Sequence, residues 1–343
     1  MIIEHLDLRV SEAASMAALA ADLRDQASDS RAISSLNRLR DQSQCVSPAV
    51  TDIIGRLRSR DEDLCAASIG GLGVAPLAAL RTPARFGQYD SYPPVRALHG
   101  LMLLFGALLG VPYHFITQQR GNLILDVFPL AGRETDQLGS SSTCMLEWHN
   151  EDAHHPMRAD FSILMCIKND QQAATKYAAA AELELPEGVE NELRRSQFVI
   201  IPDASHSYSY NVETSGVAVR SAHAFSQHER ATEDLVRIPV LTGHPANPMI
   251  CVDFPYMPPR FHTSEALEAL SALKAAIEQA SHSIVLQSGH LLAFDNRRGV
   301  HGREGFTASY DGTDRWLKRL NVLRESTLYK APQNALRALR VVA

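Results

Sequence analysis

A histidine and a glutamate separated by one residue form the pattern with the clearest chemical meaning in this sequence. His149 and Glu151 follow a run of β-forming residues, CMLEW. Residues i and i+2 of an extended segment point to the same side, so both side chains can bind one metal ion. A third ligand must come from elsewhere, and His301 follows a strand-like segment among the turn residues of LLAFDNRRGVHGREGF. Two histidines and one carboxylate that leave coordination positions open are typical of non-haem Fe(II) oxygenases.

The spacing of one histidine and one acid is a weak signal by itself. The same pattern occurs at His5-Leu-Asp7, in an expected edge strand without further ligands nearby, and there we interpret it as structural. His149 alone would also be interpreted as a structural histidine, and only its combination with the other residues favours a metal site. His154 and His155 lie next to the motif, and we interpret them as neighbours of the site rather than ligands.

Two arginines in the later segment RWLKRLNVL have the spacing of residues on one face of a strand. Arg315 lies fourteen residues after His301, and Arg319 lies four residues further along. In an extended strand their Cα atoms would be about 13 Å apart. Buried guanidinium groups are costly unless each meets an anion. One carboxylate from a co-substrate and one from a substrate would satisfy them.

Taken together, these motifs resemble the clavaminate synthase-like branch of the Fe(II)/2-oxoglutarate oxygenases. The order of His149-x-Glu151, His301 and Arg315 matches that branch. The segment LEWHNEDAHHPMRADFSILMCIKND is similar to the metal-binding segment of bacterial free-amino-acid hydroxylases, which act on asparagine, arginine or lysine. The resemblance covers about residues 112–325.

The resemblance implies a role for each matching residue. His149, Glu151 and His301 would bind Fe(II), and dioxygen and 2-oxoglutarate would be co-substrates. The substrate and co-substrate contacts that it implies are Arg315 and Thr175 for the distal carboxylate of 2-oxoglutarate, Arg319 for the substrate α-carboxylate, and Gln119, with Gln118 as the alternative, together with the free oxygen of Glu151 for the α-amino group. The alternative for Thr175 and Gln119 is a purely structural role.

Asp253, in ICVDFPYM, is the acid that we expect near the substrate side chain. In the arginine hydroxylases that the chain resembles, acids in this region meet the guanidinium group. A second acid is not visible here, and Pro255 stands nearby. A single carboxylate suits an ammonium group better than a guanidinium fork, which favours L-lysine over L-arginine as the substrate. The alternative is a structural aspartate in a turn.

Several other functions are compatible with parts of the pattern. The chain could hydroxylate or desaturate L-arginine, L-asparagine or another amino acid in natural-product biosynthesis, including antibiotic biosynthesis. Related halogenases lack the metal carboxylate, so Glu151 argues against halogenation. A jelly-roll protein that only binds a small molecule would need neither the complete triad nor Arg315. A metal hydrolase would need a general base beside the metal and no deep arginine.

Hydrophobic patterning predicts the elements that must position these residues. A long polar segment at 205–245 is typical of a lid or a binding loop. Trp148 and Trp316, each next to a motif residue, should face away from the site and pack in the core. The predicted helices cover 11–26, 48–66, 94–109 and 263–280, and the predicted strands cover 2–9, 123–128, 145–149, 161–167, 198–201, 283–287, 290–294 and 315–323.

The predicted elements indicate an α+β fold, and the resemblance implies a double-stranded β-helix (jelly-roll) core flanked by α-helices. The ligands His149 and His301 are far apart in the sequence and must meet at one ion, which favours a single oxygenase domain over 1–343. Within it, residues 1–111 would form a mainly helical N-terminal section. Residues 112–325 would form the β-helix core.

Composition excludes several other classes of protein. The 343 residues include 33 Lys and Arg against 39 Asp and Glu, without a dense basic tract, which argues against a nucleic-acid partner. The longest apolar run, Leu101–Pro112, is shorter than the ~20 residues that cross a bilayer. No signal peptide is visible, and the five scattered cysteines form no CxxC pair. We therefore expect reduced thiols and a cytoplasmic enzyme whose substrate is a small molecule. The sequence makes no prediction of the oligomeric state.

Overall fold

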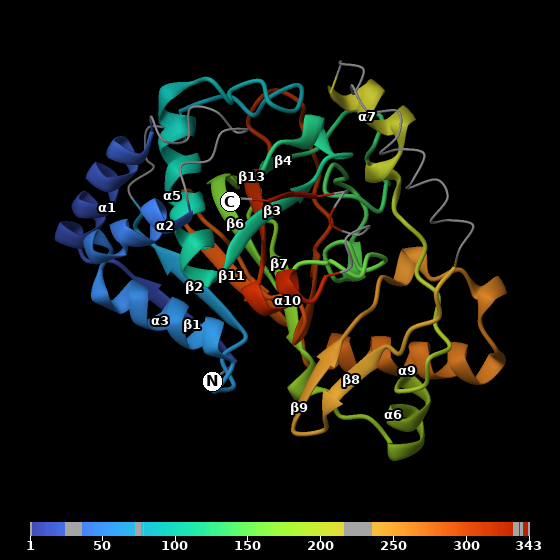
Figure 1. Cartoon of the computed structure of the whole chain (residues 1–343). Coiled ribbons are helices and arrows are strands. Elements are labelled where there is room, and N and C mark those ends of the chain that lie inside the picture. Colours follow the sequence, from blue (N-terminus) through green and yellow to red (C-terminus); the bar gives the residue numbers. More distant parts are fainter. Residues whose placement is uncertain are drawn as a thin grey trace.

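The fold is built on two β-sheets and a separate hairpin (Figure 1). The computed structural model describes residues 2–24, 36–72, 77, 79–215, 235–331, 336 and 339–341. The large sheet has the order β1 (Ile3–Asp7), β2 (Ala66–Gly70), β11 (Leu291–Asp295), β6 (Phe161–Lys168), β13 (Trp316–Leu323), β3 (Val111–Phe115) and β14 (Leu339–Val341), with β4 (Ile124–Val127) also paired to β13. The small sheet has the order β10 (His282–Ile284), β7 (Thr175–Ala179), β12 (Gly299–Arg303) and β5 (Leu146–His149). The hairpin joins β8 (Leu241–His244) to β9 (Asn247–Ile250).

Helices from the described part of the N-terminal section gather beside the large sheet (Figure 1). They are α1 (Val10–Leu23), α2 (Leu36–Asp41), α3 (Pro48–Ser59) and α5 (Pro93–Leu109). Helix α5 is buried almost all round because it packs against the other three helices on one side and against β6 and β13 on the other. Gly100 allows this packing, since a Cβ atom there would lie 2.6 Å from the Cβ of Leu23.

The remaining helices belong to the later part of the chain. Helix α6 (Glu187–Leu193) packs on α9 (Ser264–Gln279), which also contacts β7 of the small sheet. Helix α7 (Tyr208–Ser215) lies at the top of Figure 1, and α10 (Glu325–Tyr329) follows β13. Thr263 caps α9 by accepting a hydrogen bond from the backbone N–H of Ala266 (3.2 Å), which satisfies one free donor of the first turn.

Most predicted elements are confirmed, with three informative differences. The helix predicted over 48–66 ends at Ser59, because Arg60 adopts a left-handed conformation (φ 63°) and the chain then enters β2. The N-terminal section, expected to be mainly helical with a strand over 2–9, also contains β2, which the pattern does not predict and which joins β1 to the large sheet through β11. The strand predicted at 198–201 is wrong, because it is reduced to one bridge between Phe198 and Ile238.

The segment predicted as a lid contains regular structure in its described parts. Residues 204–215 form a short 3-10 turn followed by α7, and β8 begins at Leu241. Residues 216–234 of the predicted lid lie outside the described residues. None of the helices in the described part of the chain is long and apolar enough to span a bilayer. All five cysteines are free thiols, as predicted.

Candidate functional site

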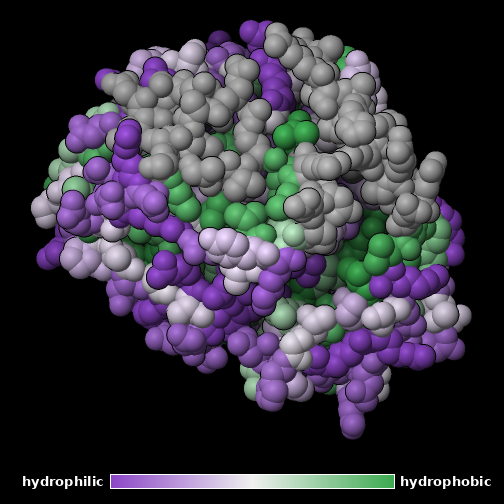
Figure 2. All heavy atoms as spheres, viewed as in Figure 1, coloured by the Kyte–Doolittle hydropathy of each residue, from purple (hydrophilic) through white to green (hydrophobic). Residues whose placement is uncertain are grey.

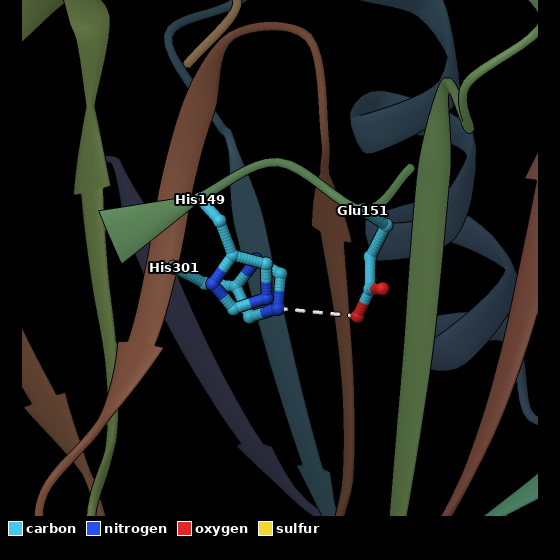
Figure 3. Close-up of side chains that lie close together, drawn as sticks. All are labelled: His149, Glu151 and His301. Carbon is cyan, nitrogen blue, oxygen red and sulfur yellow. Dashed lines mark ion pairs between the residues drawn. The ribbon is translucent and has the colours of Figure 1, made fainter. Parts of the chain in front are cut away.

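His149, Glu151 and His301 meet at one point between distant segments of the chain. His149 ends β5 and lies directly opposite His301 of β12 in the antiparallel register, with ring centroids 4.2 Å apart. Glu151 lies two residues beyond the end of β5, and its Oε1 is 3.2 Å from Nε2 of His301 (Figure 3). One ligand atom from each residue lies within 4.8 Å of the others. The three residues that the sequence singles out are therefore brought together, although His301 lies within a strand and not among turn residues.

The protonation states at this cluster suit a divalent metal ion. Burial and the neighbouring His301 lower the pKa of His149 to about 4, so this imidazole is neutral at pH 7. Its Nδ1 is bound to the carbonyl of Glu147 (2.7 Å), which leaves Nε2 for a metal. Burial alone would raise the pKa of Glu151, but Arg319 and His301 outweigh it and hold that pKa well below its usual range. A neutral imidazole at His149 and an ionised carboxylate at Glu151 are donors of the kind that Fe(II) takes in such triads.

A cavity opens beside the triad and contains a buried arginine. Arg315, just before β13, donates from Nη2 to the hydroxyl of Thr175 on β7 (3.0 Å). Both side chains line this cavity together with His149, Glu151 and His301. Burial lowers the pKa of Arg315 to about 10, and among the described residues no carboxylate forms an ion pair with it. A cationic cavity next to a metal site is a place for an anionic ligand.

Residues of β13 alternate between the site and the core, as the sequence predicts. Arg319 lines the same cavity as Arg315, and its Nη1 contacts Oε2 of Glu151. Lys318 points away and binds the carboxylate of Asp126 (2.7 Å) in the core. Trp316 is fully buried and donates from its indole N–H to the same carboxylate (2.8 Å).

The two neighbouring glutamines differ in what they offer to a ligand. The side-chain amide of Gln119 donates to the backbone carbonyl of Asp126 (2.8 Å) and accepts from its N–H (2.9 Å). Both glutamines line another pocket, which also contains His149, Glu151 and Arg319. Gln118 is buried, and its Oε1 has no hydrogen-bond partner within the described residues. Gln119 is therefore engaged in holding its own turn, and the alternative, Gln118, presents a free acceptor.

A pair of acids faces the pocket on the other side of the triad. Asp253 and Asp203 both line it, beside His149 and Arg319. Burial and then the charge of Asp203 raise the pKa of Asp253 well above its ordinary value. In the described part of the chain, no salt bridge engages either acid. The pocket therefore favours a cation at this end, and Asp203 is the second acid that sequence reasoning missed.

Other polar residues near the site have partners of their own. Asp152 and Asp203 come close to His206, but the Nε2 of His206 is bound to Asp152 (2.9 Å) and its Nδ1 to the hydroxyl of Thr117 (2.9 Å). His154 and His155 pack near His206 and Phe115 and lie outside the triad, as predicted. The view in Figure 2 shows a largely hydrophilic outer surface with hydrophobic residues gathered near its middle.

Comparison with known sequences identifies the family and several relatives. The model described as taurine catabolism dioxygenase TauD, TfdA family, matches residues 94–321. An L-ornithine/L-arginine 3-hydroxylase of Catenulispora acidiphila is 40% identical over 225 residues, 65% of this chain and 66% of that protein. An enduracididine beta-hydroxylase of Streptomyces hygroscopicus is 37% identical over the same shares of both chains. An L-lysine 3-hydroxylase of Catenulispora acidiphila is 27% identical over 65% of this chain and 58% of that protein. The matched segment thus spans about two thirds of the first two relatives.

Solved structures match nearly the whole chain. The non-heme iron oxygenase OrfP in complex with Fe, succinate and (3S)-hydroxy-L-Arg has a TM-score of 0.83 and 29% identity, covering 98% of this chain and 99% of that one. OrfP in complex with Fe and alpha-ketoglutaric acid has a TM-score of 0.79 and 28% identity, with 98% and 100% covered. Because the family match spans more than half of the chain and the fold agrees over nearly all of it, this protein is a dioxygenase that belongs to the TauD/TfdA family.

Proposed function

We propose that this enzyme is an Fe(II)- and 2-oxoglutarate-dependent hydroxylase of a free, basic L-amino acid. The observation that carries the proposal is the meeting of His149, Glu151 and His301 beside the cationic cavity of Arg315 and Thr175. When bound, the iron with 2-oxoglutarate and dioxygen supplies the oxidation of an unactivated C–H bond, with release of succinate and carbon dioxide. The protein's part is to hold that bond in place and to exclude water.

The distal carboxylate of 2-oxoglutarate and the α-carboxylate of the amino acid each have an arginine to bind them. Arg315 and Thr175 hold the distal carboxylate of 2-oxoglutarate, and Arg319 takes the α-carboxylate of the amino acid. The α-amino group donates to Oε1 of Gln118 and to the second oxygen of Glu151. These three contacts, from Arg319, Gln118 and Glu151, fix the position of the α-carbon. The side chain of the substrate then passes the metal and extends toward Asp203 and Asp253.

The two acids favour a guanidinium group over an ammonium group. The preference for L-lysine rests on a single acid, Asp253, and this preference is not confirmed, because Asp203 lines the same pocket. A planar guanidinium can donate to two carboxylates at once, which one ammonium on a flexible stem does less well. Relatives that act on ornithine and arginine support the same choice. L-Arginine is therefore our proposed substrate, with L-ornithine and L-lysine as weaker ones.

The fold-level expectations fit this function. The whole chain would form one oxygenase domain in which the two sheets make a double-stranded β-helix, with a lid at 205–245, of which residues 205–215 and 235–245 are described. The placement of His149 and His301 on the small sheet and of Arg315 beside the large sheet supports this arrangement. The cytoplasmic location stays a prediction.

The function is tested by succinate release. The purified enzyme, loaded anaerobically with Fe(II) and then mixed with 2-oxoglutarate and oxygen, is assayed with each of the twenty protein amino acids and ornithine. We expect arginine to give the largest stimulation, with a product heavier by one oxygen atom in mass spectrometry. Stimulation by none of them, or only by peptide-bound residues, would contradict a free amino acid as substrate.

Removing the paired acids should change substrate preference more than overall activity. Asp253→Asn or Asp203→Asn removes a charged hydrogen bond of about 1.5–3 kcal/mol, so the KM for arginine should rise about 10- to 150-fold. Exposed Asp61 lies outside the pocket, and Asp61→Asn is the matched control, with an unchanged KM. Equal losses for all amino acids in the pocket variants would instead indicate a structural role for the two acids.

A further inference from the structure

Glu151 needs a support that the sheet does not provide. It lies beyond the end of β5, so the pairing of β5 with β12 aligns the two histidines but leaves the carboxylate ligand in a turn. The next residue, Asp152, has a left-handed backbone (φ 53°), which marks the sharp change of direction at this point. Something else in the fold must therefore set the position of Glu151.

Asn296 holds the backbone of Glu151 on both sides of its Cα atom. Its Oδ1 accepts from the N–H of Glu151 (2.9 Å), and its Nδ2 donates to the carbonyl of Glu151 (3.3 Å) and to that of Ala159 (3.0 Å). The side chain of Asn296 is fully buried. One amide thus gives Glu151 the two hydrogen bonds that a neighbouring strand would give.

Asn150, the residue between the two ligands, makes the reciprocal connection. Its Nδ2 donates to the carbonyls of Asn296 (2.7 Å) and Gly299 (2.9 Å), and its Oδ1 accepts from the N–H of Val252 (2.8 Å). It too is fully buried. Asn296 lies in the turn that leads into β12, and Gly299 is the first residue of β12, so the bonds connect this turn and strand directly to the segment that carries His149 and Glu151.

The turn before β12 is itself fixed. Asp295 accepts from the N–H groups of Arg297 (2.8 Å) and Arg298 (3.0 Å), and its side chain is held by Nη2 of Arg60 (2.9 Å). The position of Asn296 is therefore set by contacts outside the metal cluster. A rigid support of this kind is what a preorganised ligand set requires.

We propose that Asn150 and Asn296 are positioning residues that act as an amide clamp, placing the carboxylate of Glu151 opposite His301 so that the three ligands can bind one metal ion. The inference rests on the proposed metal site. Neither asparagine is a ligand, and their effect reaches the metal only through the backbone of Glu151.

The test compares two isosteric substitutions. Asn296→Asp keeps the size of the side chain but replaces the donor to the carbonyl of Glu151 by an acceptor. The control is Asn169→Asp, because Asn169 is also buried and makes the same kind of bonds outside the triad and its cavity. Its side chain donates to the carbonyls of Ala173 (3.1 Å) and Leu286 (3.0 Å) and accepts from the N–H of Ala173 (3.1 Å).

The readout is the Kd for Co(II), titrated by its visible absorption under nitrogen, with the unfolding temperature of the metal-free protein measured alongside. Residues that orient ligands change metal affinity about 10- to 100-fold, and we expect a loss of this size for Asn296→Asp. The control should lose thermal stability but keep its Kd within about twofold, since only its stability depends on those bonds.

Two results separate a failure of the clamp from a failure of the metal site. If Asn296→Asp binds Co(II) as tightly as the unaltered enzyme, the clamp is wrong. If the unaltered enzyme itself binds Co(II) no better than His301→Ala, the metal site is wrong and with it the proposed function. Should Asn296→Asp fail to fold, Asn150→Ser, which removes the donors without adding a charge, must show the same weakening of metal binding.

Discussion

Replacing His301 by alanine is expected to lower the affinity for Fe(II) more than 100-fold and to abolish amino-acid-stimulated succinate release. The expected loss exceeds the about 10- to 100-fold that supporting residues cause, because a ligand itself is removed. His301 is the proposed ligand from β12, and the centroid of its ring lies 4.2 Å from that of His149 and 4.8 Å from that of Phe294. Its removal leaves one imidazole and one carboxylate, which is too few ligands to hold the metal at micromolar concentration.

The measurement is a metal titration of the variant, with circular dichroism to verify folding. His99→Ala is a suitable control, because His99 is also a buried histidine, on α5, and lies outside the ligand cluster. The control is expected to lose stability and to retain metal affinity. Wild-type affinity in His301→Ala would rule out the triad as the metal site, whatever the activity of the variant.

The cluster of the three proposed metal ligands could be predicted from the sequence, but the strand that carries His301 could not. The spacing of His149 and Glu151 at a strand end is a local pattern, and the relative position of residues so close in sequence depends little on the rest of the fold. Strand β12, by contrast, contains Gly299 and Gly302, which are poor strand formers. The structure explains both, since a Cβ atom at Gly299 would lie 2.2 Å from Oη of Tyr177 and one at Gly302 would lie 2.8 Å from the carbonyl of Leu146.

The substrate end of the pocket depends on tertiary structure that no local pattern reveals. Asp203 and Asp253 come from segments fifty residues apart in the sequence, and neither has neighbours that mark it as part of a pair. The choice between Gln118 and Gln119 depends on a turn in which Gln119 (φ 39°) and Arg120 (φ 64°) both adopt left-handed backbone conformations. Non-glycine residues seldom adopt this conformation, so the direction of each side chain could not be inferred from strand periodicity.

Arg315→Met is expected to raise the KM for 2-oxoglutarate about 100-fold and to leave the free protein as stable as before. Truncating one member of a buried charge pair costs about 2–5 kcal/mol of binding, or about 30-fold and more. Arg315 is buried, and within the described chain its guanidinium donates a hydrogen bond to the hydroxyl of Thr175. Removing an uncompensated buried charge costs the free protein little, so the effect should fall on the ligand-bound state.

Thermal unfolding with and without 2-oxoglutarate separates these two states. The unaltered enzyme should gain about 2.7 kcal/mol of stability when 2-oxoglutarate is present at a hundred times its Kd, and Arg315→Met should lose most of that gain. Thr175→Val removes a single hydrogen bond, so its effect should be smaller and in the same direction.

The control is Arg298, which is also a buried arginine but lies outside the cavity, where it donates to the carbonyls of Glu62 and Leu64. Arg298→Met should therefore destabilise the protein and leave the KM unchanged. An unchanged KM in Arg315→Met would place the distal carboxylate at Arg303, the other buried guanidinium of the cavity.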